Sequence, residues 1–196
     1  MLIPYSISAR PDTGLTNATL GMWLFLASEV MLFGGLFSAY VLLRMGSPEW
    51  PAGREIPSFP LGLANTGILL TSSLTMAMAV RSLRRKDVEQ YWLFMGFTVL
   101  LALSFVFVKA FEWGEKIELG MLPSTSMFLA LYFTLTGVHA LHVLGGFVAN
   151  AYLLASGFTL WSRDPERLTS RVATAGLYWQ FVDVVWIGIF VLLYIL

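Results

Sequence analysis

Five apolar stretches, each about as long as a bilayer-crossing helix, constrain the fold of this chain more than any other feature. A membrane-spanning helix needs about 20 consecutive, predominantly apolar residues. Only 12% of the 196 residues are charged, whereas an average soluble domain has about 25%. We therefore expect an all-α integral membrane protein, a bundle of five transmembrane helices that forms a single domain over residues 1–196. The expected helices cover residues 19–43, 61–80, 91–108, 125–155 and 172–196.

The lysines and arginines between these stretches predict how the bundle is oriented. Eight of the 12 lie on the side that receives the N-terminus, the second connector and the fourth connector. Because basic residues collect on the cytoplasmic side of a membrane, we expect the N-terminus inside and the C-terminus outside. The second connector carries a basic run that is a candidate for binding lipid head groups, although such runs more often only fix topology. The run consists of Arg81, Arg84, Arg85 and Lys86.

Glu29 is an acidic residue near the middle of the first stretch. A charged carboxyl at that depth costs a few kcal/mol, roughly 3 on insertion scales, so such a residue usually faces the bundle or a water-filled pocket. Desolvation there favours the neutral carboxyl. Two interpretations remain open: a proton- or lipid-linked site, or a neutral carboxyl hydrogen-bonded to a neighbouring helix. Gly34 and Gly35 follow it and would permit a close helix contact.

Four further polar residues lie inside the last two stretches. Asp183 is predicted to anchor a hydrogen bond between helices, with Gln180 on the same helix face because it lies three residues earlier. His139 and His142 are the only histidines and have the same spacing. A metal site usually needs three or four ligands. We therefore expect no metal in this chain, and we interpret the histidines as packed residues that hydrogen-bond to Asp183 or to the backbone.

Charged residues cluster at the end of the third stretch. Lys109, Glu112 and Lys116 are spaced three and four residues apart, which predicts ion pairs along one helix face. We expect this to be a solvated helix end at the membrane surface. Trp113 fits an interfacial aromatic belt beside it.

Composition and motifs exclude several classes of function. The net charge is zero, so the chain has no basic surface for nucleic acid. It contains no cysteine, which excludes disulfides, thiolate metal sites and a cysteine nucleophile. Phosphate-binding glycine loops, nucleophile elbows and metalloprotease motifs are also absent from the sequence. We expect no catalytic centre in this chain.

Four sequence strings, in a fixed order, resemble subunit III of the haem–copper respiratory oxidases, the family of cytochrome c oxidase polypeptide III. The resemblance extends from Gly21 to the C-terminus. Many family members have seven helices, and this chain resembles a short bacterial type that lacks the first two. Gln180 is a second departure, because the family usually has histidine there. The strings are SEVMLF at 28–33, KAFEW at 109–113, TGVHALHV at 136–143 and YWQFVDVVW at 178–186.

The resemblance implies an accessory role in a larger enzyme of the bacterial plasma membrane. A subunit of this kind binds no haem or copper. It docks on subunit I, which holds the haems and copper, beside subunit II, which receives electrons and can hold copper. It supports proton uptake, protects the active site during turnover, and shapes lipid-lined oxygen access, so bound phospholipid is expected. Glu29 corresponds to a family acid that is unusually reactive toward carbodiimide.

Several alternatives remain open at this point. A cytochrome c oxidase is favoured, while a quinol oxidase or a nitric oxide reductase would use a similar subunit. An independent small proton-linked transporter would use Glu29 and Asp183 as carriers, but the sequence has no inverted repeat of the kind found in such proteins. A purely structural, lipid-organising subunit is the remaining option.

Overall fold

The chain is folded almost entirely into long helices. The computed structural model describes residues 8, 10–48, 50–51 and 58–196. Within these residues there is no strand, and all five helices are long and apolar enough to cross a membrane, which confirms the predicted fold class. The elements are α1 (Asn17–Gly46), α2 (Phe59–Arg84), α3 (Val88–Glu118), α4 (Met127–Arg163), α5 (Pro165–Phe190) and a terminal π-helical turn, η1 (Val191–Ile195).

The helices extend well beyond the apolar stretches that predicted them. Residues 81–84 of the second connector form the last turn of α2 and residues 88–90 begin α3, while α4 and α5 are separated by Asp164 alone. The Asp164 carboxylate accepts a hydrogen bond from the Arg167 backbone at 3.0 Å, and Pro165 occupies the first helical position. These are strong helix-start signals. Elsewhere, charged residues with good helix propensity continue the helices past the apolar span. The predicted helices were therefore too short.

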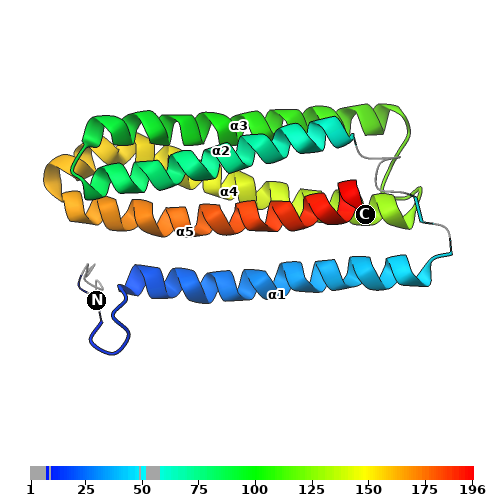
Figure 1. The fold of residues 1–196 in the computed structure, drawn as a ribbon, viewed down its shortest axis with the longest axis horizontal. Coiled ribbons are helices and arrows are strands. Elements are labelled where there is room, and N and C mark those ends of the chain that lie inside the picture. The colour runs from blue at the N-terminus through cyan, green and yellow to red at the C-terminus, as the bar shows by residue number, and fades with distance from the viewer. Residues whose placement is uncertain (1–7, 9, 49, 52–57) are drawn as a thin grey trace.

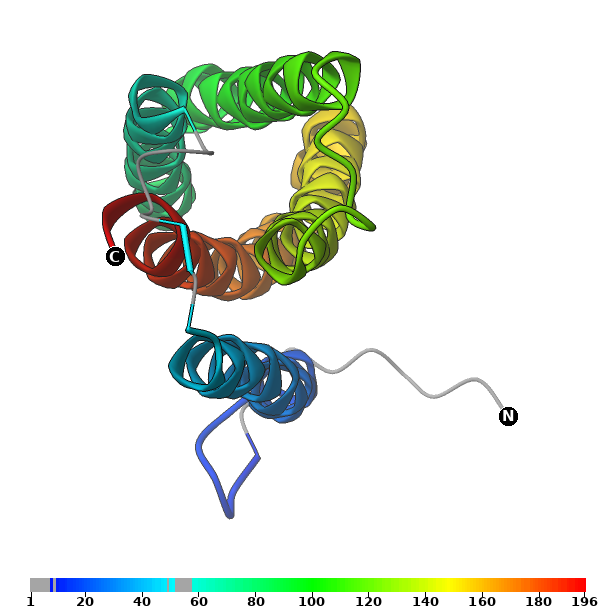
Figure 2. The same cartoon turned by 90° about the vertical axis from the view of Figure 1, so that its right-hand side faces the viewer.

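Four of the helices form a bundle, and α1 lies outside it. The end-on view in Figure 2 shows α2, α3, α4 and α5 around a common axis, with α1 beside α5. Contacts join each bundle helix to its two neighbours, and α1 touches α5 and α4. The buried residues of α1 are Leu26, Phe33 and Tyr40, which recur every seven positions and form one narrow stripe. The rest of α1 is left largely uncovered by this chain.

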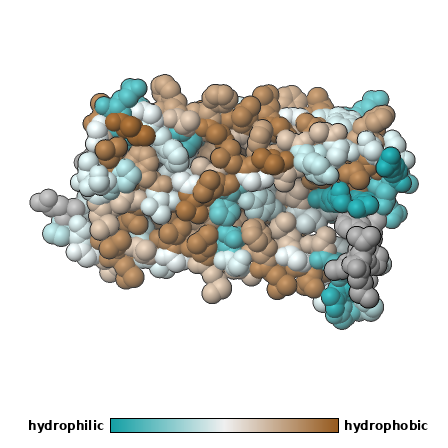
Figure 3. All heavy atoms as spheres, turned by 180° about the vertical axis from the view of Figure 1, so that it is seen from behind, coloured by the Kyte–Doolittle hydropathy of each residue, from teal (hydrophilic) through white to brown (hydrophobic). Residues whose placement is uncertain are grey.

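The bundle interior is close-packed around large aromatic residues. Trp179 and Trp186 are almost completely buried and donate hydrogen bonds to Ser72 at 3.1 Å and Thr66 at 3.0 Å. Trp179 lies directly against Gly146, where an added Cβ would come within 2.6 Å of the indole ring. Outside, hydrophobic side chains predominate along the middle of the face seen in Figure 3. Such a surface is typical of a protein whose solvent is lipid.

The two ends of the bundle differ in which segments they gather. The start of α1, the α2–α3 turn and the α4–α5 junction lie together at one end (Figure 1). This end carries the basic residues Arg81, Arg84, Arg85 and Lys86. The helices thus alternate in direction along the chain, as the predicted topology requires. Which end faces the cytoplasm stays a prediction from the distribution of basic residues.

Candidate functional site

Glu29 and His142 form a side-chain pair where α1 meets α4. The Nε2 atom of His142 lies 2.9 Å from Oε2 of Glu29. The side chains are 14% exposed for Glu29 and 17% exposed for His142, so the pair lies at the edge of the protein rather than in its core. The sequence did not reveal this partnership, because nothing in it shows which helices are neighbours. Glu29 thus contacts a neighbouring helix through an imidazole.

The other ring nitrogen of His142 determines how many protons the pair holds. Nδ1 lies 2.8 Å from the carbonyl oxygen of Val138. A carbonyl can only accept, so Nδ1 carries a hydrogen. Nε2 then either accepts from a protonated Glu29 or, in the imidazolium, donates to the carboxylate. A carboxylate facing a neutral imidazole would place two lone pairs 2.9 Å apart. The geometry therefore holds one proton between the two side chains.

Aromatic side chains surround this pair. The Phe33 ring meets the His142 ring edge-on, with centroids 5.1 Å apart. Tyr178 of α5 donates a hydrogen bond to the backbone oxygen of His142 at 2.8 Å, and Phe25 of α1 packs 6.0 Å from the Tyr178 ring. These contacts join α1, α4 and α5 beside the pair.

His139 is separated from His142 in space. It is fully buried, and its ring packs 5.2 Å from the Trp186 ring and 5.6 Å from the Phe105 ring. Among the described residues neither of its ring nitrogens has a hydrogen-bond partner. Residues three apart on a helix differ by about 60° in direction. On α4 this turns His139 into the bundle and His142 toward α1, so the predicted hydrogen bonds to Asp183 are not formed by either histidine, and only the expected backbone bond of His142 is present.

The same separation applies to the polar residues of α5. Asp183 is buried at 7% exposure and faces the bundle, whereas Gln180 is exposed on a groove beside α1. The shared polar face expected from their spacing is therefore not present. Gly34 and Gly35 would permit a close helix contact, and apart from adjacent residues and the backbone of their own helix no described atom lies within 4 Å of a Cβ built on either. Any close helix contact at these glycines would involve another molecule.

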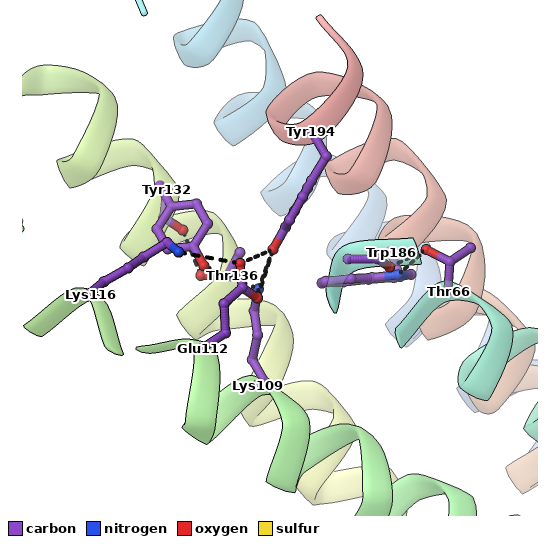
Figure 4. A network of polar contacts seen from close by, with 9 residues as sticks. Thr66, Lys109, Glu112, Lys116, Tyr132, Thr136, Trp186 and Tyr194 are labelled. Carbon is purple, nitrogen blue, oxygen red and sulfur yellow. Dashed lines mark hydrogen bonds and ion pairs between the residues drawn. The ribbon is translucent and has the colours of Figure 1, made fainter. Parts of the chain in front are cut away.

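A second polar cluster joins the far ends of α3, α4 and η1 (Figure 4). Lys109 Nζ lies 2.9 Å from Glu112 Oε2 and donates to the Tyr194 hydroxyl at 2.6 Å. Tyr194 in turn donates to Glu112 at 2.9 Å, and Lys116 Nζ lies 3.7 Å from Glu112 Oε1. The Lys109 ammonium also lies 5.1 Å from the ring centres of Tyr132 and Trp186. The predicted ion pairs are present.

The expected solvation of this cluster is wrong. Lys109, Glu112 and Lys116 are 2%, 0% and 3% exposed. They continue the buried stripe of α3 that includes Ala102 and Phe105, at the same three- and four-residue spacing. This periodicity was the available sequence signal for burial. Tyr132 and Tyr194, which contact Lys109, come from distant segments. Nothing in the sequence indicated that they would join this cluster. Trp113 is half-buried against Phe133, with ring centres 5.9 Å apart.

The described part of the chain contains no group of three or more His, Cys, Asp or Glu residues that could hold a metal ion. The two histidines have separate environments. The buried Glu112 carboxylate pairs with Lys109, whereas Oδ1 of Asp183 has no hydrogen-bond partner among the described residues. Within the described residues, these donors are therefore not brought together into one multi-ligand metal site. The candidate site is accordingly the Glu29–His142 pair, with the Lys109 cluster as a buried anchor.

Sequence comparisons relate the chain to one family of oxidase subunits. The profile of the family described as cytochrome c oxidase subunit III matches residues 12–196. Cytochrome c oxidase subunit 3 of Bacillus sp. PS3 is 35% identical over 96% of this chain and 92% of its own length. Cytochrome bo(3) ubiquinol oxidase subunit 3 of Pseudomonas aeruginosa is 34% identical over 92% and 85%. A heme-copper oxidase subunit I+III of Aeropyrum pernix is 36% identical over 89% of this chain, which spans 22% of that longer protein.

Proposed function

This chain belongs to the cytochrome c oxidase subunit III family, and we propose that it serves a terminal haem–copper oxidase as its non-catalytic third subunit. The redox centres would lie in partner subunits, with haem and copper in subunit I and copper in subunit II. The fused relative, whose name joins subunits I and III, supports direct contact with subunit I. In this proposal the chain is a multi-pass protein of a bacterial plasma membrane. It forms one transmembrane domain, with the N-terminus inside.

The observation that carries the proposed mechanism is the Glu29–His142 pair. It holds one proton at the edge of the bundle, beside a lipid-facing surface. A neutral pair tolerates the low dielectric of lipid, whereas an ion pair strengthens its attraction to nearby polar groups. The proposed roles are to support proton uptake by subunit I, to protect its active site during turnover, and to keep a lipid-lined path for oxygen.

The electron donor is proposed to be cytochrome c. A quinol oxidase is the second candidate, because the Pseudomonas relative bears that name at nearly equal identity. The donor would bind outside this chain in either case. The accessory role of the chain is therefore the same for both.

Purification through a tag on this chain, in a mild detergent, tests the proposal. A reduced-minus-oxidised optical spectrum and metal analysis of the product would show haem and copper together. The haem type would then narrow the choice of electron donor. Haem with non-haem iron and no copper would assign the chain to a nitric oxide reductase instead. A folded, colourless, metal-free single chain would contradict the subunit assignment and favour the transporter.

A further inference from the structure

The C-terminal end of α1 lies beside the C-terminal end of α5, because the two helices run in the same direction (Figure 1). Here two side chains of α1 bond to the backbone of η1. The Tyr40 hydroxyl donates to the carbonyl oxygen of Leu192 at 2.6 Å, and Nη2 of Arg44 donates to the backbone oxygen of Leu196 at 2.8 Å. The two donors are four residues apart and therefore lie on one face of α1.

The backbone of η1 offers acceptors because the helix ends there. A helix leaves its last carbonyls without an amide partner of its own. In η1 the amide of Leu196 donates to the carbonyl of Val191, five residues earlier, and the Leu192 oxygen accepts from Tyr40. The positive charge of Arg44 also interacts favourably with the negative end of the helix dipole. The end of this helix is therefore capped in part by side chains of α1.

η1 is itself held in place by the bundle. Tyr194 is almost fully buried and bonds to Lys109 and Glu112 of α3 (Figure 4). Its ring also lies against Gly62 of α2, where an added Cβ would come within 2.6 Å of it. The carbonyl that accepts from Tyr40 is two residues before Tyr194. The hydroxyl of Tyr40 therefore joins α1 to a turn whose position the bundle fixes.

The ring of Tyr40 is packed as tightly as its hydroxyl is bonded. The residue is 1% exposed, and its ring meets the Trp50 ring edge-on, with centres 5.5 Å apart. Trp50 in turn meets Phe128 at the start of α4, with ring centres 5.7 Å apart. The hydrogen bond and these ring contacts together restrain the end of α1 against both η1 and α4.

The buried stripe of α1 leads from Tyr40 to the Glu29–His142 pair. Phe33 lies seven residues before Tyr40 on this stripe, and its ring packs against His142. Glu29 is eleven residues before Tyr40, about 16 Å along the helix. A helix transmits a displacement over that distance because it moves as a rigid element. The Glu29–His142 bond of 2.9 Å would be lost if the two atoms separated by about 0.7 Å.

We propose that Tyr40 is a positioning residue for the Glu29–His142 pair. Its hydroxyl, with Arg44 as a second donor, holds the end of α1 on η1 and so keeps Glu29 within bonding distance of His142. Tyr40 acts through the helix and not by contact with the pair. The inference rests on the proposed function, in which this pair is the functional site.

The rate of carbodiimide labelling at Glu29, followed by peptide mass spectrometry in the intact tagged complex, tests this inference. Tyr40→Phe removes the hydroxyl and keeps the ring. Separation from His142 leaves a neutral, more accessible carboxyl, which is the form that reacts. The rate should rise by about fivefold, the change in population expected when one hydrogen bond is lost. Arg44→Ala should raise the rate as well.

Tyr91→Phe is the matched control. The fully buried Tyr91 donates its hydroxyl to the backbone oxygen of Leu153 at 3.1 Å, so the same group and the same kind of bond are lost. That bond joins α3 to α4, and the labelling rate at Glu29 should therefore equal that of the wild type. An equal rise in both tyrosine variants would indicate general loosening of the chain and would overturn the inference. An unchanged rate in Tyr40→Phe would also overturn it.

Nitrogen NMR of the two histidines gives a second readout. The chain is produced with isotope-labelled histidine and added back to unlabelled oxidase. In Tyr40→Phe the ring signals of His142 should shift while those of His139 stay, and in Tyr91→Phe neither should move. Signals of His142 that coincide with those of the wild type would overturn the inference, even if Glu29 did not react with carbodiimide.

Both readouts are independent of turnover. If Tyr40→Phe changed the labelling rate and the His142 signals but left the time course of oxygen consumption unchanged, the positioning role would stand and the proposed function of the pair would fail. The two failures are therefore distinguishable.

Discussion

At the scale of single residues, the central feature is a proton shared by a carboxyl and an imidazole. The hydrogen bond from Nδ1 of His142 to Val138 holds the ring in one orientation, so Nε2 faces Glu29 at 2.9 Å. Either position of the shared proton satisfies both atoms. Removing one partner leaves the other unsatisfied, which costs about 1–3 kcal/mol for a buried group.

We therefore expect Glu29→Gln and Glu29→Ala to differ. The amide of Gln can donate to Nε2 and keep the contact, so the complex should assemble with a stability near that of the wild type. Ala leaves Nε2 without a donor and should lower stability by about 1–3 kcal/mol. Thermal unfolding in detergent compares the two. Carbodiimide labelling at residue 29, mapped by peptide mass spectrometry, should vanish in both variants, and persistence at full strength would contradict the assignment of the reactive acid.

A second prediction at this scale concerns Tyr194. Its hydroxyl accepts from Lys109 and donates to Glu112, and all three are almost fully buried. Tyr194→Phe removes both bonds and leaves the buried ion pair less satisfied. Stability should fall by about 1–3 kcal/mol. Tyr152→Phe is the matched control, because Tyr152 is 60% exposed, and it should leave the unfolding temperature unchanged. Equal behaviour of the two variants would show that the cluster is not an anchor.

At the scale of elements, the α4–α5 contact depends on a glycine. An added Cβ at Gly146 would approach the Trp179 ring to 2.6 Å, whereas one at Gly145 would meet only the Tyr178 hydroxyl at an ordinary 3.7 Å. Gly146→Ala should therefore destabilise the chain by about 1–3 kcal/mol through overpacking. Gly145→Ala should be neutral or stabilising by up to about 1 kcal/mol, because alanine is the better helix former. A melting curve of Gly146→Ala that matches the wild type would contradict the packing of α4 on α5.

The elements also show which parts of the fold could be predicted. Helix type and number follow from the apolar stretches, because any backbone in lipid must satisfy its own hydrogen bonds. Helix ends did not follow, since charged residues such as Arg84 and Glu118 continue the helices outside the apolar span. The burial of Lys109 was not predicted. Its charge at the end of an apolar stretch indicates a solvated helix end, whereas its spacing along α3 continues the buried stripe. The Glu29–His142 contact could not be predicted. The two residues are 113 positions apart, and a single sequence does not show which helices pack against each other.

At the scale of the whole molecule, the four-helix bundle and α1 have different characters. The bundle is held by buried tryptophans and the Lys109 cluster, whereas α1 is attached through one stripe and the Glu29–His142 pair. Much of α1 is therefore free to meet lipid or partner subunits. An accessory subunit needs such a division between a stable scaffold and an open contact surface. We propose that the chain acts on its partner subunits through this open surface and the Glu29–His142 pair beside it.

The time course of oxygen consumption tests this account most directly. The oxidase is purified with this chain, without it, and with the chain added back, and each preparation turns over at saturating reduced donor. We expect similar initial rates per haem, followed by faster and irreversible loss of activity in the preparation without the chain. Adding the chain back should restore the slower loss. Time courses that coincide in all three preparations would contradict a role for this chain in sustaining the active site.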